Sequence, residues 1–112
     1  METSSFKISG SDLRAVSIAR YPMFFKGRRY YALAPSVALL KAWKAGKISQ
    51  VEYEERFYQE TLSPLISDQV FQDLGKEAIL LCFESPGVFC HRRIVATWLE
   101  EALKIGIPEA RT

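Results

Sequence analysis

The two cysteines and the single histidine of this chain all lie in one short stretch, LLCFESPGVFCHRR, residues 80–93. Cys90, His91 and Arg92 are consecutive, and Cys82 stands eight positions before Cys90. An ionised thiol is a nucleophile, an imidazole exchanges a proton near neutral pH, and a guanidinium binds anions. Cys90 is therefore a candidate nucleophile, His91 a candidate proton donor or acceptor, and Arg92 a candidate anion-binding group.

The elements around this stretch predict where these side chains lie. Residues 78–83 are apolar on both alternating faces, which is typical of a central strand covered on two sides. A loop over residues 85–89 leads into a helix expected from about Cys90 to Lys104. Its amino terminus offers unpaired N–H groups and the positive end of the helix dipole, so the sequence favours an anion there.

Helical spacing also predicts which way these side chains face. His91 and Arg92 share a stripe with Val95, so both should lean toward the sheet. An inward Arg92 must meet a carboxylate, carbonyl groups or a ligand, because an unpaired buried guanidinium is costly. Arg93 lines up with Thr97 and is expected to face solvent.

A second basic cluster, RYPMFFKGRRYY at residues 20–31, follows a predicted strand at residues 13–19. If the two strands are parallel, both loops emerge at the carboxyl edge of the sheet, where open α/β sheets bind ligands. Basic groups interleaved with aromatic rings suit a phosphate-bearing molecule such as a nucleotide or a single-stranded nucleic acid. The predicted ligand-binding residues are Arg20, Lys26, Arg28, Cys82 and Arg92.

Turn and cap residues mark the remaining elements. Helices are expected to begin at Ser36, at Ser49 with a capping box to Glu52, and at Ser67. The first of them should end at Gly46 and the last at Gly75. Residues 3–6 are a possible short edge strand.

Several specific chemistries fail on spacing. A cysteine phosphatase loop needs an arginine six residues after its cysteine, and neither cysteine has one. A C-x-x-C pair is absent, because seven residues separate Cys82 and Cys90. Zinc could use both cysteines and His91, but neighbouring Cys-His ligands are awkward and Glu84 is the only evident fourth ligand. We therefore expect no metal and no cofactor, and no glycine-rich phosphate loop is present.

Composition sets the outer bounds. The chain has 112 residues, 48% hydrophobic and 25% charged, which predicts one domain with a modest core. A formal net charge of +2 is too mild to indicate nucleic-acid binding by itself. No signal-peptide pattern or membrane-length apolar run is evident, so we expect a cytoplasmic protein whose two cysteines stay thiols.

Each feature also has a structural interpretation. Cys82 in an apolar strand is commonly a small core residue, and Cys90 is open between packing and chemistry. His91 can be a helix-end residue bonded to a carbonyl. Arg20 and its neighbours can be an ordinary solvated loop, and Tyr53 and Phe57 are expected to pack in the core.

The chain resembles the short bacterial and archaeal members of the family called domain of unknown function 488. The resemblance covers roughly residues 16–99. Its motifs are the cysteine-bearing strand followed by Cys-His-Arg and a K-G-x-x-Y-x-x-L-A-P segment, here Cys82, Cys90-His91-Arg92, Lys26-Gly27, Tyr30, Leu33, Ala34 and Pro35. It implies an α/β fold with the Cys-His-Arg turn near a pocket, and no particular reaction.

We predict a single α/β domain over residues 1–112, with a mainly parallel sheet, helices packed around it, and ends at 1–5 and 108–112 that can be flexible. The leading hypothesis is a small enzyme or ligand-binding domain with an anion site at the Cys-His-Arg helix terminus. The alternative is a non-catalytic module whose basic-aromatic loop contacts nucleic acid or a protein partner. An enzyme predicts a pocket that His91 and Arg92 enter, whereas a module predicts an open basic surface and inert thiols.

Overall fold

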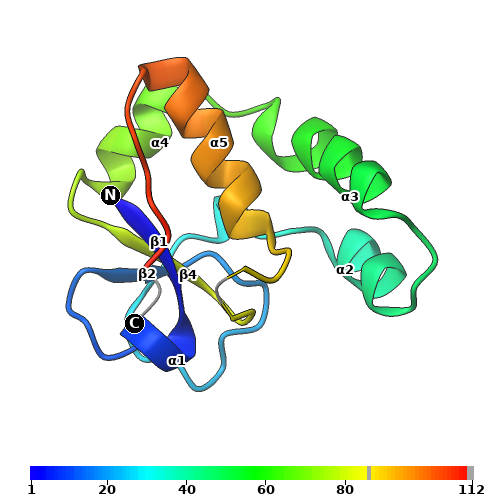
Figure 1. The fold of residues 1–112 in the computed structure, drawn as a ribbon, viewed down its shortest axis with the longest axis horizontal. Helices are drawn as coiled ribbons and strands as arrows, with labels where there is room; N and C mark the ends of the chain where they lie inside the picture. Colours follow the sequence, from blue (N-terminus) through cyan, green and yellow to red (C-terminus); the bar gives the residue numbers. More distant parts are fainter. Residues whose placement is uncertain (86, 111–112) are drawn as a thin grey trace.

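The computed structural model describes residues 1–85 and 87–110, and it alternates short strands with helices (Figure 1). The strands are β1 (Glu2–Ser5), β2 (Ala15–Ser17), β3 (Arg28–Arg29) and β4 (Ile79–Cys82). The α-helices are α1 (Phe6–Ser9), α2 (Val37–Lys44), α3 (Gln50–Phe57), α4 (Ser67–Leu74) and α5 (His91–Leu103). A 3₁₀ turn, η1 (Tyr31–Leu33), precedes α2, and a π turn, η2 (Tyr58–Leu62), extends α3.

The strands form one parallel sheet in the order β1-β4-β2-β3, which confirms the predicted α/β fold. The strand β4 pairs with β1 on one side and with β2 on the other, and all four of its residues are buried. The prediction of a central strand at residues 78–83 is therefore confirmed. Because β2 and β4 are parallel, the loops that follow them leave the sheet at the same carboxyl edge.

The two faces of the sheet carry different cores, since side chains alternate along a strand. On one face, Leu80 and Val16 pack with buried residues of α2 to α5 in the main core. On the other, Ile79 and Leu81 pack with Phe6 of α1 in a smaller cluster. On the first of these faces α5 lies across β1 and β4, and α3 and α4 pack against α5 (Figure 1).

All three predicted helices are present, but only two of the three serines cap them. The hydroxyls of Ser36 and Ser49 accept hydrogen bonds from N–H groups three residues further on, as N-caps do. Ser67 is instead the first helical residue of α4, and Ile66 occupies the cap position without a side-chain bond. The glycines expected to end helices, Gly46 and Gly75, have positive φ values of 70° and 88°.

Both ends of the chain meet beside the sheet. Residues 2–5 form the edge strand β1, and Thr3 makes an isolated parallel bridge with Glu109 (Figure 1). Ile107 is buried in the main core. Residues 111 and 112, part of the C-terminal end for which flexibility was expected, lie outside the described residues. Within residues 1–85 and 87–110, the helices are too short and too polar to cross a bilayer.

Candidate active site at the Cys-His turn

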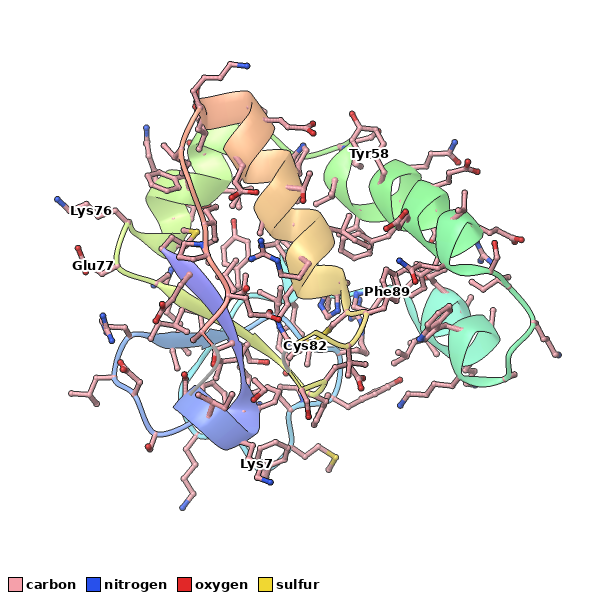
Figure 2. The ribbon with its side chains drawn as sticks, in the orientation of Figure 1. Lys7, Tyr58, Lys76, Glu77, Cys82 and Phe89 are labelled. Atoms are coloured by element: carbon pink, nitrogen blue, oxygen red, sulfur yellow. A yellow bond between two sulfur atoms is a disulfide. The ribbon has the colours of Figure 1, made fainter. Side chains whose placement is uncertain are left out.

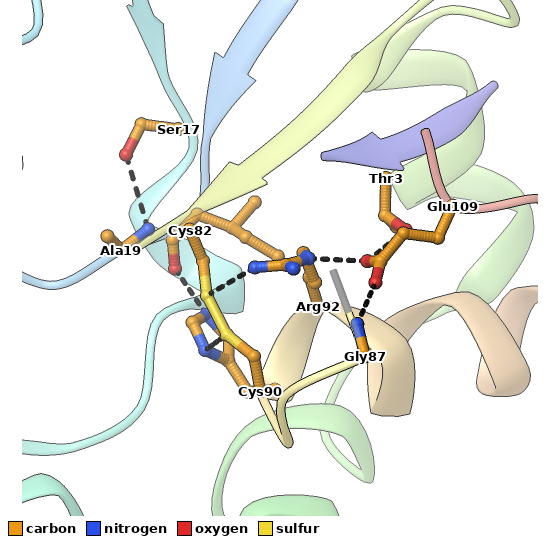
Figure 3. The surroundings of a disulfide bond; sticks show 10 residues. Thr3, Ser17, Ala19, Cys82, Gly87, Cys90, Arg92 and Glu109 are labelled. Atoms are coloured by element: carbon orange, nitrogen blue, oxygen red, sulfur yellow. Dashed lines mark hydrogen bonds and ion pairs between the residues drawn. A yellow bond between two sulfur atoms is a disulfide. The ribbon is translucent and has the colours of Figure 1, made fainter. Parts of the chain in front are cut away.

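The two cysteines come together because α5 folds back onto the strand that precedes it. Cys82 ends β4, and Cys90 is the N-cap residue of α5. Their sulfurs are joined in a disulfide, and both residues are buried (Figure 3). This corrects the expectation of two free thiols. The turn between β4 and α5 brings the two side chains together, although seven residues separate them in the sequence.

The backbone holds the two cysteines far apart for a disulfide. Their Cα atoms are separated by 7.3 Å. Disulfide-bonded cysteines usually have Cα atoms about 4.4–6.8 Å apart. The main chain therefore sets the two side chains at a separation wider than a disulfide needs.

His91 turns inward, as its helical position predicted. Its Nε2 lies 2.7 Å from the carbonyl oxygen of Ile18, and its Nδ1 lies 3.6 Å from Cys90 Sγ. A carbonyl can only accept, so Nε2 carries the proton and the lone pair of Nδ1 faces the sulfur. Burial is the main reason that the pKa of His91 falls to about 4. The hydrogen bond to Ile18 raises this pKa, and the positive charge of Arg92 lowers it further. The imidazole is therefore neutral at physiological pH.

Arg92 is fully buried behind the disulfide. Its Nε donates to Glu109 Oε1 at 2.6 Å, and its Nη1 donates to Cys82 Sγ at 3.5 Å (Figure 3). Its Nη2 finds no hydrogen-bond partner among the residues that the structure describes. The inward direction and the carboxylate partner match the expectation, but an anionic ligand at Arg92 would first have to displace Glu109.

Glu109 is a site residue that the sequence did not indicate. Its carboxylate also accepts from Thr3 Oγ1 at 3.1 Å and from the Gly87 N–H at 3.3 Å. Burial raises the pKa of Glu109, but the Arg92 hydrogen bond and charge outweigh it and hold the pKa below its usual value. Nothing local marks this glutamate, because it lies 17 residues from Arg92 in an irregular segment.

Arg93 differs from its expected position. It is half-buried, and its Nη1 donates to Thr3 Oγ1 at 2.9 Å and to the carbonyl of Ile107 at 2.8 Å. The expectation that it faces solvent is wrong, because the segment after α5 returns along that side of the helix. The two arginines thus tie α5 to both chain ends.

A pocket of about 250 Å³ opens on the other side of the disulfide. We call it the Cys–His pocket. Residues from β4, α2, α3, the start of α5 and the loop after β2 line it. The ones that bear on its chemistry are Cys82, Cys90, His91, Arg20, Lys44 and Glu84.

Aromatic rings wall the Cys–His pocket, and the sequence did not assign them this role. Trp43 lies 5.5 Å from Tyr53 and 5.0 Å from Phe89, measured between ring centroids. Figure 2 shows Phe89 between α2 and the start of α5. Tyr21 lines the same pocket. Tyr53 is buried as expected, but it also contributes to this wall.

Of the basic residues predicted to bind a ligand, Arg20 alone lines the Cys–His pocket among the described residues. Its Nε donates to the Pro35 carbonyl at 2.9 Å, which fixes the guanidinium at the rim. Lys26 is exposed on the loop and does not line the pocket.

The Arg28 side chain lies near the amino ends of β2 and β4, away from the Cys–His pocket. Pairing of β3 with β2 places Arg28 level with Val16. Its guanidinium donates to the carbonyls of Asp73 and Leu74. Arg20 lines the Cys–His pocket whereas Arg28 contacts the end of α4, so the predicted cluster is divided.

The chemical groups converge closely. The two sulfurs and one nitrogen of Cys82, Cys90 and His91 lie within 4.8 Å of one another. As thiols, this set suits nucleophilic chemistry; as thiolates with a neutral imidazole, it suits a soft divalent metal. A wider groove of about 950 Å³ between α3 and α5 also touches Cys90, but neither His91 nor Arg20 lines it.

Comparison with known proteins identifies the family. No curated protein and no solved structure matches the chain significantly. A family model described as the active DUF488-N3 subclade, DUF488-N3a, matches residues 10–103. The match spans the sheet from β2 onward and all of α5, and it confirms the resemblance seen in the Cys-His-Arg turn. The chain belongs to the family called domain of unknown function 488.

Proposed function

We propose that this domain binds a small phosphate-bearing ligand in the Cys–His pocket and acts on it through Cys90. The observation that carries the proposal is the convergence of Cys82, Cys90, His91 and Arg20 on one pocket at the carboxyl edge of a parallel sheet. The matching family model is described as an active subclade, which agrees with a chemical role.

The size of the pocket limits the ligand. Small-molecule sites usually enclose about 300–1,000 Å³. A pocket of about 250 Å³ lies just below that range. It suits a phosphate with a small attached group, or the end of a larger ligand that continues into solvent.

The walls of the pocket set its ligand preference. Arg20 and Lys44 supply positive charge, and Trp43 and Tyr21 supply flat apolar surface. The amino terminus of α5 adds main-chain N–H groups near Cys90 and His91, since Cys90 makes no side-chain cap bond. An anionic group joined to a planar one, as in a nucleotide, meets both kinds of surface.

The thiol chemistry requires reduction of the disulfide by an external thiol. Two equivalents of the thiol form their own disulfide and leave two protein thiols. Cys90 Sγ then attacks an electrophilic centre of the ligand, and the leaving group departs with the electrons of the broken bond and the thiol proton. His91 Nδ1, 3.6 Å from the sulfur, accepts the S–H hydrogen bond and orients it.

Arg92 has a different part in this proposal from the one expected. It does not line the Cys–His pocket, and Glu109 already occupies its Nε. Its Nη1 instead donates to Cys82 Sγ, so it stabilises that sulfur as the leaving thiolate when the disulfide is reduced. Arg20 takes over the anion-binding role.

A second candidate function is the non-catalytic module, and an exposed aromatic cluster favours it. The rings of Phe24 and Phe83 are half-exposed or more, and they pack against each other and against Phe6 with centroid separations of 5.0–5.7 Å. Exposed Lys26 lies on the same loop as Phe24. Such a surface can stack on the bases of a single strand.

A ligand-dependent shift in thermal unfolding tests the first proposal. The reduced protein, with a chelator present, is heated alone and with inorganic phosphate or nucleoside monophosphates. A ligand of the folded state raises the unfolding midpoint in proportion to its binding. Arg20→Ala should abolish the shift, and Arg28→Ala, which removes the same charge away from the Cys–His pocket, should retain it.

Two outcomes oppose the proposal. If none of the phosphates shifts the wild-type midpoint, the pocket does not take this class of ligand. If Arg28→Ala loses the shift as fully as Arg20→Ala does, the anion is held by overall charge and not by the Cys–His pocket. A shift produced by oligonucleotides alone, and lost in Phe24→Ala, would favour the module.

A further inference from the structure

We propose that Cys82, Cys90 and His91, once reduced, form a zinc site whose fourth position opens into the Cys–His pocket. The proposal does not depend on the phosphate-bearing ligand, because it rests on the positions of three side chains alone. While an ion is bound, Cys90 is a ligand and is not free to attack, so metal occupancy would control the proposed thiol chemistry.

The distance between Cys90 Sγ and His91 Nδ1 already fits tetrahedral zinc. Zinc lies about 2.3 Å from thiolate sulfur and about 2.0–2.1 Å from imidazole nitrogen, which places two tetrahedral ligands about 3.5 Å apart. The structure places these two atoms 3.6 Å apart. Neighbouring Cys-His ligands therefore pose no geometric obstacle here, because extended Cys90, with φ −153° and ψ 149°, is followed directly by the first turn of α5.

The orientation of His91 is that of a metal ligand. A metal-bound histidine almost always donates its other ring N–H to a carbonyl or a carboxylate, which fixes the ring and its tautomer. His91 makes this bond from Nε2 to the main-chain oxygen of Ile18 at 2.7 Å. The free lone pair of Nδ1 is thereby directed at the sulfurs.

The cysteine backbones suit two sulfurs that share an ion. Two thiolates on one tetrahedral zinc lie about 3.8 Å apart. The Cα separation of 7.3 Å exceeds the usual disulfide range and leaves room for the sulfurs to separate after reduction. The disulfide must first take up two electrons and two protons from an external thiol. Zinc then displaces one proton from each thiol.

The groups around the proposed zinc site balance its charge. Two thiolates balance the charge of the ion, and Arg92 donates a further hydrogen bond to Cys82 Sγ while Glu109 offsets its charge. The three ligands line the Cys–His pocket, so a water molecule or a ligand can reach the fourth position. Three protein ligands with one open position is the arrangement of catalytic zinc sites.

The direct test is a metal titration of the intact chain. The protein is reduced with a phosphine, the reductant is removed without oxygen, and Zn²⁺ is added in competition with a chromophoric chelator. We expect one tightly bound zinc per reduced chain and none in the disulfide form. Co²⁺ in place of zinc should give the intense visible bands of a tetrahedral ion and a near-ultraviolet thiolate charge-transfer band.

Variants then assign the ligands. Cys82→Ser and Cys90→Ser should each weaken zinc binding by more than the roughly 10–100-fold loss caused by removing an outer partner. His91→Gln should do the same. Glu60→Gln removes an exposed carboxylate outside the pocket and should bind zinc like the wild type. Circular dichroism of each variant shows whether it is folded.

The wild-type result alone can overturn the proposal, whatever the variants do. Reduced wild-type protein that takes up no stoichiometric zinc, or that gives the weak octahedral spectrum with cobalt, would contradict it. Failure of the phosphate experiment leaves this result untouched, because that experiment is done with a chelator present.

Discussion

The guanidinium of Arg92 donates to the carboxylate of Glu109 at 2.6 Å, and this ion pair is buried. The Arg92 side chain is fully buried, and the Glu109 side chain is only 9% exposed. This pair joins the first turn of the helix that carries the candidate site to the C-terminal segment beside β1. The contact explains how a buried cation is tolerated behind the two cysteines.

Removal of one partner of this buried pair should destabilise the fold. Glu109→Ala leaves the Arg92 charge without its carboxylate, and the free energy of unfolding should fall by about 3 kcal/mol. Urea unfolding measures the loss. Glu101→Ala, an exposed position on α5, is the matched control and should change it by no more than about 0.5 kcal/mol. Equal effects of the two substitutions would contradict the assigned role of Glu109.

The same pair makes stability depend on pH at the acidic end. The folded pKa of Glu109 lies below its ordinary value of 4.5. Its stabilising contribution is therefore complete above that value and is lost as the pH falls through the lower folded pKa. The difference in unfolding free energy between the wild type and Glu109→Gln should be constant near neutral pH and shrink below pH 4.5. A difference that stays constant as the pH falls far below 4.5 would show that the carboxylate charge does not contribute.

Trp43 should report ligand binding in the Cys–His pocket. Its indole lines the pocket and packs against Phe89, whereas Trp98 on α5 does not line it. Binding of a phosphate-bearing ligand should change the fluorescence of Trp98→Phe, in which Trp43 remains, and leave that of Trp43→Phe almost unchanged. The reverse pattern would place the ligand in the groove between α3 and α5, which Trp98 lines.

Two serines that look alike in sequence should behave differently. Ser49 accepts a hydrogen bond from the Glu52 N–H and caps α3, so Ser49→Ala should cost about 1 kcal/mol. Ser67 makes no cap bond at the start of α4, so Ser67→Ala should change stability by less than about 0.5 kcal/mol. Denaturant unfolding of both variants measures the contrast, and similar losses would contradict the assigned cap positions.

The serine pair also shows how far the sequence predicts the fold. The cap at Ser49, the central strand over residues 78–83 and the span of α5 follow from local patterns, and the structure confirms them. At α4, Ile66 occupies the cap position and Ser67 is already the first helical residue. The presence of a serine predicted the helix but placed its cap one residue too late. Local signals therefore predict that an element exists better than they predict where it begins.

The candidate site was predictable only in its local part. Cys90, His91 and Arg92 are adjacent in sequence, and helical geometry is enough to turn His91 and Arg92 inward. The partner Glu109 and the aromatic wall at Trp43 come from distant segments, and no spacing rule connects them to the turn. Arg28 was grouped with Arg20 because both follow β2 closely in the sequence, but the Arg28 guanidinium donates to the carbonyls of Asp73 and Leu74 at the end of α4.

In our proposal, the Cys–His pocket is where this domain receives its ligand. The most direct test is a ¹H–¹⁵N NMR titration of the reduced protein with a nucleoside monophosphate. We expect the amide shifts to concentrate at the lining residues, among them Ala19, Arg20, Lys44, Phe83 and His91. Shifts that concentrate instead at the edge formed by Arg14, Arg28 and Gly75, or that spread evenly over the exposed basic residues, would contradict it.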